Sequence, residues 1–297
     1  MSYAHADHFS TVRGKVVTVA RAVQQIQPSE DTGTQGGEQR PGRGPIDWLG
    51  GWRTGLVAPL LLLALAIGLR IYQQFFAWSS GLDSSSHAFT LHWRTVLIGG
   101  LLGVGAFTLV WWGWLVRTGK TIARRIAHDE EVRRIAVFWG LVGATSVTLY
   151  IEASFFPNQD GAWHQTAVRD TAFTPSHIPM FYVFFPLGIT MTIGTYLYGR
   201  TRLPRIYGAA KGFPWSFALL IAASVTEMGQ VAMNEWGHSL WFPEEFFAAP
   251  FHWPFVFYGW LAAGIFALWA ETLIRLLGIE GEVAAGKTSG DVDEAAA

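Results

Sequence analysis

Residues 95–116 read TVLIGGLLGVGAFTLVWWGWLV, a stretch without a charged side chain that ends directly before Arg117. About 20 consecutive apolar residues are needed for a helix to cross the hydrocarbon core of a bilayer. Five other stretches approach this length: residues 56–76, 135–153, 178–198, 215–233 and 254–277. The stretch 215–233 is the weakest of them, because it contains Glu227 and Gln230. We therefore predict an all-α polytopic membrane protein, a bundle of about six transmembrane helices.

The composition of the whole chain agrees with this class of protein. Hydrophobic residues make up 51% of the sequence and charged residues 14%, against roughly 25% charged residues in an ordinary soluble domain. The net charge of -1 provides no field that would attract nucleic acid, so nucleic acid is excluded as a partner. Because the chain has no Cys, any metal must be held by His, carboxylate or amide groups.

Basic residues are concentrated in alternate loops of the predicted bundle. Six lie between residues 116 and 135 and four between residues 198 and 215, whereas the intervening outside loops hold only Arg94 and Arg169. Loops rich in Lys and Arg remain in the cytoplasm. Both termini are therefore predicted to be cytoplasmic, in an inner or intracytoplasmic membrane. We expect a cytoplasmic extension over residues 1–50, a transmembrane domain over residues 51–278 and a flexible tail over residues 279–297.

The loop between the third and fourth stretches contains a first candidate ligand set. Residues 158–164 read NQDGAWH, and His177 follows at the start of the fourth stretch. If the loop is helical, Asp160 and His164 lie four residues apart on one face, where their carboxylate and imidazole converge. His177 would complete a set of three ligands on the extracytoplasmic side.

The next outside loop repeats this arrangement with Asn234, His238 and His252. Two His residues and one oxygen ligand suit Cu, Zn or Fe, and spacing alone does not name the metal. Each set on its own could also be purely structural and hold no metal. Interfacial His residues often form hydrogen bonds with helix ends, and Asp160-Gly161 is a common turn dipeptide. The occurrence of two sets on the same side favours metal binding.

Other acidic residues have simpler interpretations. Glu227 lies inside a predicted span, where a carboxyl group is costly and usually faces a cavity or a partner; we expect it to be protonated or bonded to Gln230. Glu152 is interpreted as part of an interfacial salt bridge, with a supporting role at the ligands as the alternative. The charged group at residues 130–134 is interpreted as a solvated cytoplasmic helix end.

Several motifs resemble the C-type subunit of the copper membrane monooxygenases, the family of particulate methane, ammonia and hydrocarbon monooxygenases. The longest is the run from Gln159 to His177, which includes Phe173-Thr174-Pro175-Ser176-His177. The others are residues 78–84 (WSSGLDS), 130–134 (EEVRR), 201–204 (TRLP), 234–238 (NEWGH) and 249–253 (APFHW). The resemblance covers the chain from about Trp78 to Trp260.

The resemblance implies two copper sites and a larger assembly. Asp160, His164 and His177 match one copper site of the family, and Asn234, His238 and His252 match a second. Members of the family act as trimers of heterotrimers, in which this subunit associates with an A-type and a B-type subunit among membrane lipids. They use O2 to hydroxylate a small substrate, with quinol as the expected electron donor.

Three positions depart from the pattern of the family. Ala172 stands where Asp is usual, Met180 stands where Glu is usual, and Glu227 is additional. These changes affect the surroundings of the ligands and the substrate range. Met180 adds an apolar wall close to His177, which favours a short-chain hydrocarbon over ammonia; Glu227 would act in the opposite sense only if it were ionised and faced the same cavity. Two functions of other classes remain as alternatives: a metal transporter or copper-delivery protein that uses the same ligands transiently, and a structural subunit whose partner carries the catalytic copper.

Overall fold

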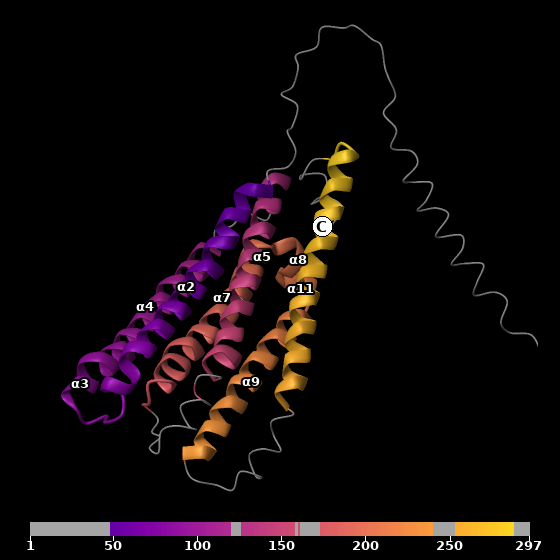
Figure 1. The fold of residues 1–297 in the computed structure, drawn as a ribbon. Coiled ribbons are helices and arrows are strands. Elements are labelled where there is room, and N and C mark those ends of the chain that lie inside the picture. Colours follow the sequence, from indigo (N-terminus) through magenta and orange to yellow (C-terminus); the bar gives the residue numbers. More distant parts are fainter. Residues whose placement is uncertain (1–47, 120–125, 158–159, 161–172, 240–252, 288–297) are drawn as a thin grey trace, which may run out of the picture. The chain divides into compact units, whose positions relative to one another are not determined.

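The computed structural model describes residues 48–119, 126–157, 160, 173–239 and 253–287 (Figure 1). These residues form helices joined by short turns, and the described ranges contain no strand. The all-α class predicted from the sequence is therefore confirmed. The N-terminal extension predicted for residues 1–50 falls almost entirely outside the described residues.

Six long helices make up the bundle. They are α2 (Trp48–Ser80), α4 (Thr95–Gly119), α5 (His128–Tyr150), α7 (Phe185–Arg202), α9 (Trp215–Ser239) and α11 (Trp253–Ala284). Short elements extend or join them: α3 (His87–Phe89), α8 (Pro204–Tyr207), the 3-10 helix η4 (Ala209–Lys211) and the π-helical segments η1 (Thr90–Arg94), η2 (Ile151–Phe155) and η3 (Ile178–Phe184). Segments η1 and η3 run directly into α4 and α7, and η2 continues α5.

Five segments of the described chain are long and apolar enough to cross a membrane. They are Gly55–Ser80, His87–Gly119, His128–Phe155, Ile178–Arg202 and Gly259–Ala284. The apolar part of α9, Trp215–Gly229, is shorter, in agreement with the weak fifth stretch of the sequence. The chain is a multi-pass membrane protein of about six helices.

Large apolar side chains cover the outer faces of α2 and α4. Phe75 on α2 is 72% exposed and Leu109 on α4 is 77% exposed. Exposed apolar faces of this extent are unusual on a protein surrounded by water. They are the faces expected where helices contact lipid.

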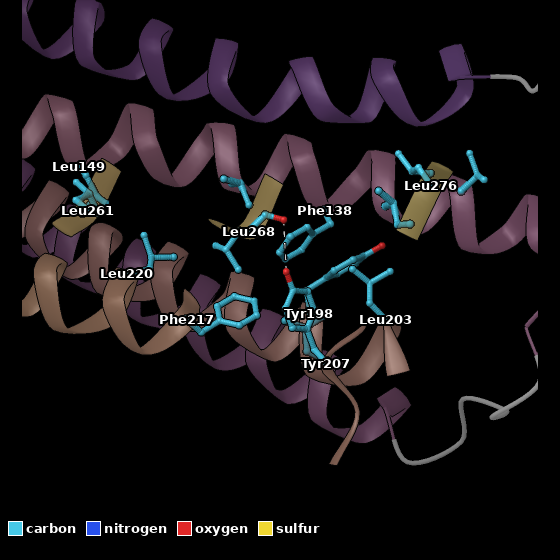
Figure 2. Close-up of a cluster of buried hydrophobic side chains, with 14 of the residues drawn as sticks. Phe138, Leu149, Tyr198, Leu203, Tyr207, Phe217, Leu220, Leu261, Leu268 and Leu276 are labelled. Atoms are coloured by element: carbon cyan, nitrogen blue, oxygen red, sulfur yellow. Dashed lines mark hydrogen bonds between the residues drawn. The ribbon is translucent and has the colours of Figure 1, made fainter. Parts of the chain in front are cut away.

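The main core lies between α5, α7, α9 and α11 (Figure 2). Phe138 of α5 packs edge-on against Phe217 of α9, with ring centroids 5.9 Å apart. Tyr207 packs against the same Phe217 ring and donates a hydrogen bond of 3.5 Å to the carbonyl of Leu268 on α11. Aromatic side chains of this size bury large apolar areas and favour tilted contacts. They fix the lateral order of these helices.

Helix α11 continues to Ala284, beyond the start of the tail predicted at residue 279. Ile279 is 1% exposed, and the Glu282 carboxylate accepts hydrogen bonds from Arg275 at 2.7 and 3.2 Å. One apolar anchor and one ion pair therefore hold the added helical turns. Residues 288–297 lie outside the described residues.

The interpretation of residues 130–134 as a solvated helix end is wrong for Glu131. Its side chain is 2% exposed, and its carboxylate pairs with Arg205 at 2.6 Å and with Arg275 at 2.9 Å. Arg205 and Arg275 come from α8 and α11. The start of α5 is therefore tied to two other elements by a buried ion network.

The six long helices alternate in direction, so the start of α2 and the end of α11 lie at the same end of the bundle (Figure 1). This arrangement agrees with termini on one side of the membrane. That this side is the cytoplasm stays a prediction from the distribution of basic residues.

Candidate functional site

Asp160 and His177 come together at the end of the bundle where α5 with η2 ends and η3 begins. Oδ2 of Asp160 lies 3.2 Å from Nε2 of His177, and each residue is 1% exposed. These are two of the three residues of the first predicted ligand set. The structure therefore brings together a carboxylate and an imidazole that are 17 residues apart in the sequence.

The residues directly before His177 hold this pair in place. The Ser176 hydroxyl donates a hydrogen bond to Oδ1 of Asp160. The Thr174 hydroxyl lies 3.2 Å from that of Ser176, and it accepts a hydrogen bond of 3.4 Å from the backbone N–H of His177. The sequence gives no separate reason to single out Ser176 or Thr174. Their position within the Phe-Thr-Pro-Ser-His run is the one signal that could have identified them.

Helix α2 and the residue after it contact Pro175 of the Phe-Thr-Pro-Ser-His run. Nε2 of Gln73 donates a hydrogen bond of 2.8 Å to the carbonyl of Pro175, and Gln73 is buried. Gly81, directly after α2, lies so close to Pro175 that a β-carbon there would come within 3.2 Å of the proline Cδ and nearer still to its Cγ. This contact explains why a Gly is needed within the WSSGLDS motif.

The surroundings of His177 are apolar on the side of η3. The Phe181 ring meets the imidazole edge-on, with centroids 5.3 Å apart, and Ile178 and Met180 are fully buried. Met180 packs in one cluster with Phe156 and Phe184. Phe181 therefore gives the imidazole an apolar neighbour, and a contact of Met180 with His177 stays a prediction.

The remaining predicted ligands are described only in part or not at all. His164 and His252 lie outside the described residues. Asn234 and His238 lie on α9, whose backbone is described there, but their side chains are outside the description, as is that of Gln230. Within the described ranges no three His, Cys, Asp or Glu side chains converge. The second ligand set therefore stays a prediction.

The contact between Asp160 and His177 has the length of a hydrogen bond, and this length also suits two ligands of one metal ion. Oxygen and nitrogen donors bound at about 2.0–2.2 Å to one metal ion lie roughly 3.0–3.4 Å apart at coordination angles of about 90–110°. The observed distance of 3.2 Å lies in this range. Both side chains are buried, and a carboxylate with an imidazole suits Cu, Zn or Fe. The pair fits a metal site whose further donors come from other residues.

Two more carboxyl groups lie deeper in the bundle. Glu152 in η2 and Glu227 on α9 are each 1% exposed, and their side chains are close enough to interact electrostatically. The Glu152 oxygens have no hydrogen-bond partner among the described residues. Arg169, the basic residue predicted to take part in the interfacial salt bridge, lies outside them, so that salt bridge stays a prediction. Glu227 precedes Asn234 by seven residues on α9. It therefore lies about 10 Å from Asn234 along the helix axis, towards the start of α9.

Comparisons with known proteins identify the family of the chain. A search of the curated proteins gives no match. A family model named AmoC, which describes the C-type subunit of ammonia monooxygenase and methane monooxygenase, matches residues 45–280. The match includes Asp160, His177 and the supporting residues Gln73, Gly81 and Ser176, and it covers most of the chain. The chain therefore belongs to the AmoC family of ammonia monooxygenase and methane monooxygenase subunits.

Proposed function

We propose that this chain is the C-type subunit of a copper-dependent membrane monooxygenase that uses O2 to hydroxylate a short-chain hydrocarbon. The observation that carries the proposal is the buried contact between Asp160 and His177, at a distance suited to two ligands of one metal ion. Membership of the family supplies the reaction class. The reaction consumes O2, two electrons and two protons, and it yields the alcohol and water.

The residues of this chain would prepare the metal site. Asp160, His164 and His177 would hold copper, which supplies O2 binding and one-electron redox chemistry when bound. The Ser176 hydroxyl fixes one oxygen of Asp160, so that the other faces His177. Hydrogen bonds of this kind orient ligands and commonly raise metal affinity.

The apolar side chains beside His177 would serve the substrate. Phe181 borders the imidazole of His177 with an apolar ring. Met180, buried three residues after His177, would extend this apolar wall. An apolar wall excludes water and offers ammonia no polar partner. A hydrocarbon fits such surroundings better, and its size would decide selectivity.

A second copper site and the partner proteins complete the proposal. Asn234, His238 and His252 would form the second site. The A-type and B-type subunits of the family would associate with this chain in a trimer of heterotrimers, and a quinol would donate the electrons. The metal sites would lie on the extracytoplasmic side of the inner or intracytoplasmic membrane, since the opposite end of the bundle carries the basic loops.

The metal assignment is tested on the purified complex. His177→Ala and Asp160→Asn should each lower the copper content and abolish hydroxylation while the complex stays assembled, because two remaining ligands bind a metal more weakly than three. Copper is measured by elemental analysis and assembly by size-exclusion chromatography. Unchanged copper with full turnover would disprove the assignment, whereas lost copper with full turnover would identify the alternative in which this chain is a structural component.

The substrate is tested separately in whole cells that express the complete complex. Methane, ethane, propane, butane, ethene and ammonia are offered one at a time, and O2 uptake is recorded for each. We expect at least one hydrocarbon to be oxidised faster than ammonia. If ammonia gives the fastest uptake, the inference from the apolar wall is wrong and the metal assignment is unaffected.

A further inference from the structure

A cavity of about 400 Å³ lies at the end of the bundle opposite Asp160 and His177. It is formed by the end of α4, the start of α5 and the end of α7. Its lining residues are Trp114, Thr118, Glu130, Arg133, Arg134, Val137, Tyr198 and Arg202. Two motifs of the sequence, EEVRR and TRLP, meet here without a role in the proposed metal site.

The lining of the cavity carries an excess of positive charge. Glu130 is its one carboxylate among the described residues, and it accepts hydrogen bonds from Arg133 at 2.6 and 2.8 Å and from Arg134 at 2.7 Å. Arg202 has no carboxylate partner among the described residues. Three guanidinium groups thus face one carboxylate, so the cavity has two positive charges that the described residues leave unbalanced.

Arg202 is fixed rigidly although its charge is not neutralised. It is 5% exposed. Its Nη1 donates to the Leu115 carbonyl at 2.6 Å and its Nη2 donates to the Thr118 hydroxyl. The guanidinium stacks over the Trp114 ring, 4.7 Å from the centroid. A buried cation held only by neutral groups is costly unless an anion compensates it.

The cavity opens beside a surface suited to acyl chains. Trp114 is 54% exposed, and Val110, one turn earlier on α4, is 72% exposed. Trp side chains are typical of the boundary between hydrocarbon and headgroups. Basic pockets between transmembrane helices on the cytoplasmic side, where the basic loops predict this end of the bundle to lie, bind anionic lipid headgroups. Guanidinium groups match phosphate oxygens in geometry.

From this arrangement we propose that the cavity binds the phosphate of an anionic phospholipid, with the acyl chains along α4. Arg133 contacts the phosphate through its Nη1 and Arg134 through its Nη2. Neither of these two nitrogens makes a hydrogen bond within the described residues. Arg202 supplies the buried charge. The site is independent of copper, so its failure would not affect the proposed monooxygenase activity.

The test uses the intact complex, delipidated in detergent and titrated with phosphatidylglycerol, phosphatidylcholine or inorganic phosphate. Native mass spectrometry counts bound lipid, and thermal unfolding reports stabilisation. Phosphatidylglycerol should bind most tightly. Arg133→Gln should weaken this binding about fivefold, because one surface charge is removed. Arg117→Gln is the matched control: Arg117 is an exposed Arg of the last turn of α4 outside the cavity, and its loss should leave the affinity unchanged.

Three results would overturn the proposal. Equal binding of inorganic phosphate and phosphatidylglycerol would show a site for free phosphate. Equal lipid affinity of Arg133→Gln and the unaltered complex would show that the cavity does not bind lipid. Loss of a partner protein from Arg133→Gln, with lipid binding unchanged, would show that the cavity receives a protein partner.

Discussion

The carboxyl group of Glu152 occupies the space that a β-carbon on Gly188 would need. Such a β-carbon would lie 2.9 Å from Cδ and 3.0 Å from Oε1 of Glu152. The carboxyl group cannot move far, because Glu152 is 1% exposed. The Glu152 carboxyl group of η2 can therefore pack against α7 only because residue 188 is a Gly.

Gly188→Ala should destabilise the complex because the added methyl group displaces a buried carboxyl group. Overpacking of this kind costs about 1–3 kcal/mol. Thermal unfolding of the purified complex measures the effect. The double variant Glu152→Ala/Gly188→Ala should lose less stability than the sum of the losses of the two single variants. Gly143→Ala on α5, where a β-carbon would meet nothing within 4 Å, should not destabilise. Strict additivity of the two changes would show that the two residues are not in contact.

Ser176→Ala should weaken metal binding because it removes the donor to Oδ1 of Asp160. Loss of an outer hydrogen bond typically lowers metal affinity by about 10–100-fold. Copper affinity is measured by competition with a chelator. Ser79→Ala serves as the control, since its hydroxyl bonds to the Phe75 carbonyl of its own helix. Equal copper affinity in Ser176→Ala and Ser79→Ala would refute the positioning role.

Glu131→Gln should lower the stability of the complex strongly. The change leaves Arg205 and Arg275 without their shared buried carboxylate, and breaking a buried ion pair costs about 3–5 kcal/mol. Glu280→Gln is the matched control because Glu280 is exposed on α11. We expect a lower unfolding midpoint for the first variant and no shift for the second. An unshifted midpoint in Glu131→Gln would show that the ion network does not stabilise the bundle.

The topology is tested with single Cys residues, since the chain has none of its own. Ser84 in the turn after α2 and Lys211 in η4 are both exposed. An impermeant thiol reagent added to intact spheroplasts should modify Ser84→Cys and leave Lys211→Cys unmodified. Permeabilised cells serve as the control, where both should react. The opposite pattern would reverse the orientation of the bundle.

The sequence predicts the helices well because apolar length is a local property. The uncharged stretch 95–116 corresponds to α4 at Thr95–Gly119, and 178–198 corresponds to η3 and α7 together. The pairing of Asp160 with His177 follows from their ligand types and from the resemblance to the family. The third ligand of that set, His164, remains a prediction.

Contacts between distant parts of the chain are not predictable from local patterns. Glu131 meets Arg205 and Arg275 across 74 and 144 residues of sequence, so the charged start of α5 looks solvated from its sequence alone. The contact of Glu152 with Gly188 is of the same kind, since nothing in either local sequence names the other. Only the packing of the helices determines which polar residues are buried.

The π-helical turns on both sides of Asp160 make the direction of the ligands depend on chain length. In η2 the Phe156 N–H bonds to the Ile151 carbonyl, and in η3 the Phe185 N–H bonds to that of Met180, so each turn holds one residue more than an α-helical turn. Removing one residue from η3 would restore α-helical spacing and swing His177 by about 100° around the axis of α7. A single-residue insertion or deletion in η2 or η3 would thus change the direction of the Asp160 or His177 side chain while the helices on either side keep their packing.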